Sequence, residues 1–483
     1  MRAIIFCFLC FLSLDTAFAQ QRNPYDSLKR PARNKSIVRD SAERSIRLNR
    51  IFIVGNRITR DRIILRELTL KPGDVAYGVE LPIILDMDKK KLINTRLFNT
   101  VEIRILESPG DQMDLLIDVN ERWYTFPAPI FELADRNFNE WWQNYNHDFR
   151  RVNYGLRLYQ FNMRGRNETL RLTAQFGFQR RFEISYRIPY IDKKQKHGLM
   201  LDFDFSESKN LAYRTFDHKL QFLRAEDLLR ITRGGGVTYT FRKSFYASHA
   251  LKLEYRSNTI NDTIAHINPN YFGEGKTSQQ YGIVAYQFTS DHRDYVGYPL
   301  KGYYLTTGIS KTGLSGRDDV NKTDVNATFA AYVSLKNNFF FSNNTVGLWS
   351  TPRDLPYANY SALGYRKQFV RGYEIYVIEG PIYVLNKTTF KKRVFSRIYN
   401  WNLMPIRQFR YIPLSIFLKS YADLGYVENY YNYEINSRLS GKLISGVGGG
   451  VDIVASYDAV FRFEYTLNAE GQRGFFFHIK KEF

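Results

Sequence analysis

Hydrophobic and polar residues alternate along most of the chain with the two-residue period of β-strands. In the segment 199–205, one face carries Leu199, Leu201, Phe203 and Phe205, and the other Met200, Asp202 and Asp204. In the segment 461–467, one face carries Phe461, Phe463, Tyr465 and Leu467, and the other Arg462, Glu464 and Thr466. These strands are long and their apolar faces are heavily aromatic, which favours a lipid-facing band over the core of a soluble sandwich.

Strand patterns of this kind recur from Trp123 to the end of the chain, separated by turn signals. We count about sixteen of them, which fits an even-numbered outer-membrane barrel. The pattern therefore predicts a transmembrane antiparallel β-barrel over residues 122–483. We expect the barrel to be closed, because backbone groups at an open sheet edge have no partners in lipid.

Residues 46–121 show a different pattern, in which helical and strand periods follow one another. They predict one small α+β domain of order β-α-α-β-β, in which Lys71–Asp74 ends the first helix. The expected elements are a strand Ile46–Val54, a helix capped by Thr59 and reaching Leu68, a helix from about Val79 to Arg96, and strands Val101–Ile105 and Leu115–Val119.

The chain begins with the features of an export signal. Arg2 is followed by the apolar stretch Ala3–Leu14, and Ala17–Ala19 forms a small-x-small cleavage site. We assign residues 1–19 to a signal peptide and the polar residues 20–45 to a disordered lead-in. Both cysteines, Cys7 and Cys10, lie inside the signal, so the mature chain has no disulfide or thiolate site.

Composition narrows the possible functions. The chain holds 35 Tyr and 37 Phe and has a net charge of +21. Because lysines and arginines interleave with aromatics at strand spacing, we ascribe the charge to a basic lumen or to lipid head groups, and expect no nucleic-acid partner. The seven histidines show no ligand spacing, and neither HExxH nor GxSxG occurs. We therefore expect no metal, no cofactor and no enzymatic activity.

Short segments of the N-terminal domain carry a family resemblance. The order of elements, with "FIVGN", "ILRELTLKPGD" and "RLFNTVEI", resembles a POTRA domain. POTRA domains are the periplasmic modules of the outer-membrane assembly-factor superfamily (BamA/TamA-like proteins, the bacterial surface antigen family). The resemblance implies that the barrel lies in the bacterial outer membrane and the domain in the periplasm.

The barrel segment resembles the same superfamily. "NMRGRNETL" (162–170) is similar to an early hairpin, and "SDHRDYVGYPLKG" (290–302) to a strand end and turn with Asp291, Arg293, Asp294, Pro299 and Gly302. "FVRGYE" (369–374) resembles the motif of a long loop that folds back into the lumen, and "YADLGYV" (421–427) the strand motif that faces it.

About 30 residues separate the strand near Phe341–Ser350 from the next one near Ile382, which is long for a structureless loop. Within it, Arg371 needs an anion in a low-dielectric lumen, and Asp423 is the best candidate partner. Gly372 would let the loop turn sharply. We therefore predict a latch that pins the loop inside the barrel, formed by Val370, Arg371, Gly372, Tyr373, Asp423 and Gly425.

The end of the chain resembles the C-terminal strand signature of outer-membrane proteins. Its apolar face, interrupted at Lys481, consists of Phe475, Phe477, Ile479 and Phe483. We predict that these residues close the barrel and serve as the assembly signal. The nearby "SGVGGGVD" (445–452) either weakens strand pairing at a gate or makes a tight inward bend.

The resemblance implies an assembly or insertion factor that receives client strands at the POTRA domain and inserts or translocates them through a barrel seam. The alternatives are a dedicated secretion pore of the two-partner type and lipid transport across the outer membrane. The expected partners are unfolded outer-membrane or secreted polypeptides, outer-membrane lipid and accessory lipoproteins. A single POTRA domain departs from the usual pattern and suggests a specialised paralogue.

Overall fold

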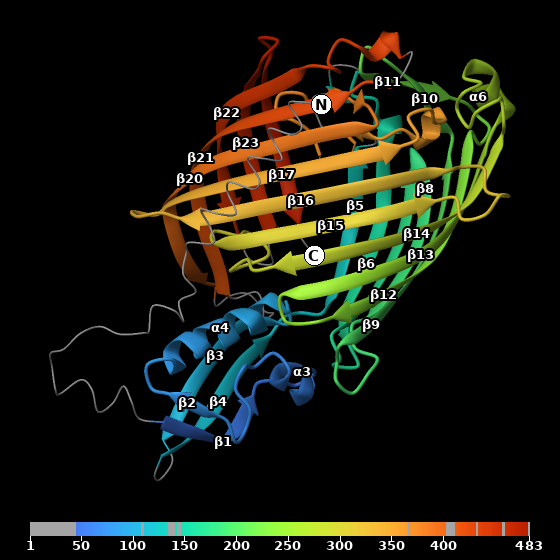
Figure 1. Cartoon of the computed structure of the whole chain (residues 1–483). Coiled ribbons are helices and arrows are strands. Elements are labelled where there is room, and N and C mark those ends of the chain that lie inside the picture. Colours follow the sequence, from blue (N-terminus) through green and yellow to red (C-terminus); the bar gives the residue numbers. More distant parts are fainter. Residues whose placement is uncertain are drawn as a thin grey trace.

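The computed structural model describes residues 45–107, 111–133, 141–142, 146–365, 368–401, 411–430, 433–455 and 459–481. The signal peptide 1–19, the lead-in as far as residue 44 and Phe483 lie outside these residues. Within them, a small α+β domain stands at one end of a large curved sheet (Figure 1). No helix among the described residues is both long and apolar enough to cross a membrane.

The N-terminal domain is a four-stranded sheet of order β2-β1-β4-β3, in which β1 and β4 run parallel. Its core is formed by apolar residues of both helices and of the sheet, among them Ile63, Leu92 and Ile117. The elements are β1 (Ser45–Val54), α3 (Asp61–Leu65), β2 (Val75–Tyr77), α4 (Leu81–Asn94), β3 (Phe98–Glu107) and β4 (Gln112–Glu121).

Two details differ from the sequence prediction. The three-residue strand β2 stands between the helices, and it is too short to show a period of its own. Helix α3 ends at Leu65 instead of Leu68, and its N-cap position is Arg60, which makes no side-chain cap. Thr59 is not the cap because its hydroxyl donates to Glu121 Oε1 at 2.6 Å, so it fixes the loop to strand β4.

The large sheet contains sixteen strands, each antiparallel to its neighbours, as the sequence predicts. The predicted alternation is also observed: Tyr465 and Leu467 are exposed on the outer face, whereas Glu464 and Thr466 are buried inside. The strands are β5 (Thr125–Leu133), β6 (Val152–Met163), β7 (Glu168–Gly177), β8 (Gln179–Ile188), β9 (His197–Ser208), β12 (Arg230–Arg242), β13 (Ala247–Ile260), β14 (Ser278–Asp291), β15 (Gly302–Thr312), β16 (Lys322–Ser334), β17 (Phe339–Thr351), β20 (Ile382–Asn400), β21 (Tyr411–Glu428), β22 (Leu443–Val454), β23 (Ala459–Asn468) and β24 (Arg473–Lys481).

The two ends of this sheet are its first and last strands, β5 and β24. Over the described residues no ladder joins them, so the expected closure by hydrogen bonds is not formed there. We call the boundary between β5 and β24 the seam.

Short elements lie at the end of the barrel opposite the N-terminal domain (Figure 1). Glu379 is fully buried among them and accepts hydrogen bonds from Tyr433 at 2.6 Å and Thr215 at 2.7 Å. We call these elements the cap: β10 (Asn210–Phe216), β11 (Lys219–Arg224), α6 (Asp262–Ile267), η3 (Tyr357–Asn359), β18 (Ala362–Leu363), β19 (Ile378–Glu379) and η5 (Glu434–Asn436).

Candidate functional site: the barrel lumen, its loop and the seam

The segment between β17 and β20 folds into the barrel instead of lying on its surface. Val370 and Tyr373 are both buried, and the Tyr373 N–H donates to the Val370 carbonyl at 2.9 Å, which closes a tight turn. Gly372 has φ +91° in this turn, a backbone conformation that costs glycine little. The structure therefore places the tip of the loop inside the lumen.

Arg371 at this tip is nearly fully buried, with 7% of its surface exposed. Its Nε donates to Asp423 Oδ2 at 2.8 Å, and its backbone N–H donates to the same oxygen at 3.1 Å. The guanidinium lies 3.7 Å from the centre of the Tyr421 ring. Side chain and backbone thus bond to one buried carboxylate on β21, which fixes both the position and the direction of the loop.

The ion pair belongs to a larger buried network on the inner face of β21 to β23. Arg371 Nη1 donates to Glu464 Oε1 at 3.2 Å, and Lys419 Nζ lies 2.8 Å from the same oxygen. Lys419 also pairs with Asp452. Opposite charges alternate through the network, which offsets much of the cost of removing each charge from water.

Glycines make room for the loop on the strands that face it. A Cβ at Gly446 would lie 1.9 Å from the Arg371 carbonyl oxygen, and one at Gly425 would lie 2.5 Å from Val370 Cγ2. The loop backbone therefore packs directly on the backbone of β22, and the Val370 side chain packs on the backbone of β21. The glycine-rich run 445–452 thus has a structural reason that neither of the two sequence-based interpretations included.

A second lumen contact comes from the turn between β14 and β15, the "SDHRDYVGYPLKG" segment. Asp294 Oδ1 accepts from the backbone N–H groups of Tyr295 at 2.9 Å and Leu300 at 3.0 Å, so it holds the turn in shape. Tyr298 is buried and donates to Asp452 Oδ2 at 2.8 Å. The turn is therefore joined to the buried charge network, a role that its sequence did not indicate.

The N-terminal domain is fixed to the barrel by specific contacts. Arg242 at the end of β12 donates to both carboxylate oxygens of Glu67, at 2.9 and 3.1 Å. Asn162 Nδ2 donates to Thr59 Oγ1 at 2.8 Å. A Cβ at Gly165 would lie 2.0 Å from the Ile58 carbonyl oxygen, so the backbones touch there. The "NMRGRNETL" hairpin is thus one docking point of the domain, and the end of β12 is another.

The C-terminal strand turns its aromatic residues outward. Phe475 and Phe477 are 57% and 46% exposed, whereas Phe476 is buried. Ile479 pairs through its backbone with Phe461, but its side chain and the whole of Phe483 lie outside the described residues. The predicted signature therefore lies on the last strand of the sheet, directly at the seam.

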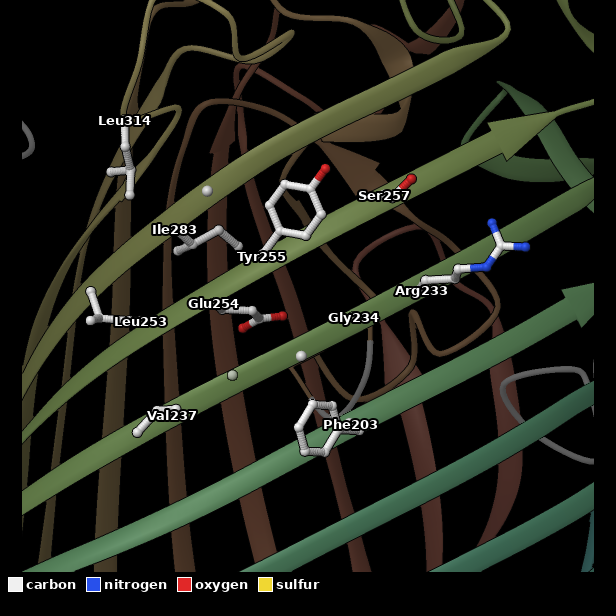
Figure 2. Close-up of a pocket in the computed structure, with 13 residues that line it drawn as sticks. Phe203, Arg233, Gly234, Val237, Leu253, Glu254, Tyr255, Ser257, Ile283 and Leu314 are labelled. Carbon is white, nitrogen blue, oxygen red and sulfur yellow. The ribbon is translucent and has the colours of Figure 1, made fainter.

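The outer wall also carries a shallow apolar groove, away from the seam (Figure 2). It crosses β9, β12, β13 and β14, and Gly235 and Gly282 belong to its lining. Phe203, Val237 and Leu253 border it and are exposed, while Arg233 lies toward one end. The groove is part of the lipid-facing wall and has no link to the lumen network.

A sixteen-stranded antiparallel sheet with a filled lumen and a docked α+β domain defines an outer-membrane β-barrel protein with a single periplasmic module. Residues 162–483 match the Omp85 superfamily domain, and residues 46–122 match the POTRA family described as surface antigen variable number repeat. The chain therefore belongs to the Omp85 superfamily, which confirms the resemblance found in the sequence. The barrel lies in the outer membrane and the POTRA domain in the periplasm.

Individual relatives are distant. The outer membrane protein assembly factor BamA of Nitratidesulfovibrio vulgaris is 24% identical over 308 residues, which are 62% of this chain and 34% of that protein. The chain thus spans about a third of that relative's length. Two solved structures show the same fold: BamA from Haemophilus ducreyi lacking POTRA domains 1–3 (15% identity, TM-score 0.51, 90% of this chain and 84% of that one) and CdiB from Escherichia coli (13%, 0.55, 90% and 76%).

Proposed function

We propose that this protein is an outer-membrane assembly factor that accepts unfolded polypeptide at its POTRA domain and delivers strands to the membrane through the seam. The observation that carries the proposal is the combination of a filled lumen with an unpaired seam. A strand that cannot pass along the lumen while the loop and cap occupy it can still pair with the open ends of the sheet.

The filled lumen counts against a simple diffusion pore. The loop tip lies on β21 and β22, and the cap occupies the opposite end of the barrel. Arg371 and Glu464 are buried there with their partners, so an open water channel at this level would require the network to break. The lumen of an outer-membrane diffusion pore is normally polar, filled with water and free of such plugs.

We infer that Arg371 and Asp423 act as the latch of this loop. The pair is removed from water and has two hydrogen bonds from the arginine side chain, so breaking it leaves a buried charge. The latch would keep the lumen closed while client strands pass through the seam. The other predicted latch residues would let the loop turn and pack closely on the strands. They are Val370, Gly372, Tyr373 and Gly425.

The POTRA sheet supplies the expected entry point for clients. Strand β3 forms one edge of the sheet and is paired only with β4, so its other edge can accept an extended segment. Backbone hydrogen bonds would hold such a segment with little demand on its side chains. Unfolded outer-membrane polypeptides are therefore the proposed clients, and accessory lipoproteins the proposed partners.

Polypeptide secretion of the two-partner type is the second candidate. The shared fold with CdiB favours it, because the two proteins match over 90% of this chain. Secretion would need the loop to leave the lumen, so it would require the latch to open. Lipid transport, the third possibility, is favoured by no lumen contact among the described residues.

Depletion of the protein in its native host, followed by quantitative proteomics of the outer membrane, tests the proposal. A fall in many barrel proteins is the expected result. Loss of a single exported protein would replace the proposal by dedicated secretion. An intact outer-membrane proteome would overturn both protein-directed functions and leave lipid movement as the alternative.

A further inference from the structure

The apolar groove on the outer wall of the barrel has two glycines in its floor. Gly235 of β12 and Gly282 of β14 are both paired with Tyr255 of β13, so all three residues face the lipid side of the wall. The Tyr255 ring is 53% exposed and stands between the two glycines (Figure 2). The hollow holds about 730 Å³, which is the size of a small-molecule site.

The rims of the groove depend on the absence of side chains at these glycines. A Cβ at Gly235 would lie 3.1 Å from Phe203 Cδ1, and one at Gly282 would lie 2.9 Å from Leu314 Cδ1. Phe203 and Leu314 are themselves 60% and 52% exposed, so both have apolar surface to offer to a molecule in the groove. Any larger residue in the floor would displace a rim and fill the hollow.

One end of the groove is polar. Arg233, Ser257 and Gln280 lie side by side on β12, β13 and β14, one step along the strands from the glycines. The Tyr255 hydroxyl donates to Gln280 Oε1 at 2.7 Å, which leaves the Gln280 amide nitrogen as a donor. The guanidinium, the Ser257 hydroxyl and this amide together form a row of donors with one positive charge. Such a row suits an anion.

The positive charge of Arg233 is not neutralised within the part of the chain that the structure describes. Arg233 is exposed, and its guanidinium lies 5.7 Å from the centre of the Phe205 ring. The acid on the same face of β9, Glu207, pairs instead with Arg180 at 3.5 Å. An arginine on a lipid-facing wall is costly unless it lies near the interface or meets an anion.

The polar end of the groove points away from the periplasm. Arg230 at the start of β12 donates to the Tyr271 hydroxyl of the cap at 3.3 Å, whereas the other end of β12 contacts the POTRA domain. Arg233 therefore lies about 10 Å along the strand from the outer end. Val237 and Leu253 continue the groove toward the middle of the membrane. The order from outside to inside is thus donor row, glycine floor, apolar wall, which is also the order of headgroup and acyl chain in the outer leaflet.

We infer that this groove binds a lipid of the outer leaflet that carries an anionic phosphate headgroup. The phosphate accepts hydrogen bonds from Arg233, Ser257 and Gln280, and guanidinium matches phosphate geometry well. One acyl chain lies over Gly235 against the ring of Tyr255, where close contact adds dispersion attraction. This site does not depend on the proposed delivery of polypeptide through the seam.

The first test uses the full-length protein in nanodiscs of phosphatidylcholine. A small fraction of phosphatidic acid carries a photoreactive group on its acyl chain. Irradiation should label Val237 about tenfold more than Val325 of β16, because the two residues are equally exposed, at 41% and 40%, but only Val237 lines the groove. The same photoreactive chain on phosphatidylcholine should show little preference. Equal labelling of Val237 and Val325 by phosphatidic acid would overturn the inference.

The headgroup contact is tested by Arg233→Gln, which removes the charge and should lower labelling of Val237 to the level of Val325. The matched control is Lys392→Gln. Lys392 is another exposed cation on the outer wall, 5.0 Å from the centre of the Phe339 ring, but it lies on β20 at the periplasmic end. This variant should leave labelling of Val237 unchanged. Equal losses in both variants, or full labelling in Arg233→Gln, would contradict a phosphate site at Arg233.

The groove itself is tested by two variants that keep Arg233. Gly235→Leu fills the floor, and Leu314→Trp narrows the groove from an exposed rim without a change in a strand. Heat-modifiable gel mobility shows which of them fold. In a folded variant, labelling of Leu253 by phosphatidic acid should fall several-fold. Unchanged labelling would mean that Arg233 attracts lipid as an interfacial charge and that no acyl chain occupies the groove.

A last measurement identifies the occupant in the native host. A photoreactive phenylalanine derivative replaces Tyr255, and the adduct that forms in living cells is analysed by mass spectrometry. The expected adduct is a phosphate-bearing lipid. An adduct with a protein would assign the groove to a partner protein and overturn the inference, and so would an adduct with lipids that carry no net negative charge.

Discussion

Arg371 and Asp423 are 52 residues apart in the chain, yet the guanidinium Nε lies 2.8 Å from the carboxylate Oδ2 inside the barrel. The contact joins the tip of a long loop to the inner face of β21. Because the Arg371 backbone N–H bonds to the same carboxylate, the pair fixes the main chain as well as the side chain. Both the side chain and the main chain of the loop tip are therefore tied to this carboxylate.

Charge reversal tests this dependence. Arg371→Asp or Asp423→Arg alone leaves like charges buried together, which costs roughly 3–5 kcal/mol and should release the loop. In both single variants we expect greater proteolysis of residues 368–381 and less assembly of outer-membrane proteins. The double variant Arg371→Asp, Asp423→Arg should recover part of the loss. If limited proteolysis and activity show no recovery, the pairing does not act as a latch.

Docking of the POTRA domain depends on a second buried carboxylate. Glu67 accepts two hydrogen bonds from Arg242 and also pairs with Arg66 at 2.9 Å. Glu67→Ala removes the shared anion, so we expect a loss of about 2–3 kcal/mol in the domain–barrel contact. Spin-label distances between the domain and the barrel should then show a broader distribution, because the domain gains angular freedom.

The control for this variant is Asp86→Ala, which removes a surface partner of Lys90. Exposed ion pairs contribute little, so the distance distribution should stay as in wild type. An equal broadening in both variants would mean that the Glu67–Arg242 contact has no special part in docking.

Because the loop packs closely on β22, alanine substitution of two nearby glycines of this strand should affect stability differently. Gly446→Ala places a Cβ on the Arg371 carbonyl oxygen, so the loop must shift. Gly449→Ala meets its first neighbour, the Lys419 carbonyl oxygen, at 3.4 Å, which is ordinary contact. Heat-modifiable gel mobility should show a lower unfolding temperature for Gly446→Ala and little change for Gly449→Ala. Similar behaviour of the two variants would contradict the packing described here.

The cap contains a histidine that must stay neutral. His218 is fully buried, and its Nε2 accepts a hydrogen bond from the Leu439 N–H at 2.9 Å. Burial, with a smaller contribution from Arg438, lowers the pKa of His218 to about 4. Because the unfolded cap binds this proton more readily, the stability that neutral His218 provides is present above pH about 6.5 and is lost as the pH falls toward 4.

Amide exchange of β10 and β11 should therefore accelerate between pH 6.5 and 4.5, after correction for the intrinsic rate. Asp217 and Glu470 also act on His218, and Glu379 titrates in the same cap, so the comparison needs a variant. In His218→Gln the Leu439 N–H keeps an acceptor, and the part of the pH dependence due to His218 should vanish. An unchanged pH profile in this variant would contradict the prediction.

The strand period of the sequence predicted the sixteen-stranded sheet because lipid on one side and a polar lumen on the other impose strict alternation. Segments 199–205 and 461–467 show this directly. Arg371 and Asp423 could be paired in advance because a buried arginine needs an anion and the segment 421–427 offered one. Strand β2 was missed because three residues carry no detectable period.

Other parts of the site were out of reach of such reasoning. Tyr298, Lys419 and Asp452 are far apart in the chain. Pairing of β21 with β22 places Lys419 near Asp452, and the turn between β14 and β15 brings Tyr298 to the same carboxylate. The close approach of the loop to Gly446 became visible only with the loop in place.

A reversible lock on the seam shows whether client strands pass between β5 and β24. Cysteine pairs can be introduced between Thr125–Phe131 of β5 and Arg473–Phe477 of β24, because residues 20–483 contain no cysteine, and then oxidised in cells. If client strands are delivered through the seam, the cysteine pair that oxidises efficiently should stop the assembly of other outer-membrane barrels. A reductant should then restore assembly. Normal assembly by a fully locked protein would contradict the account.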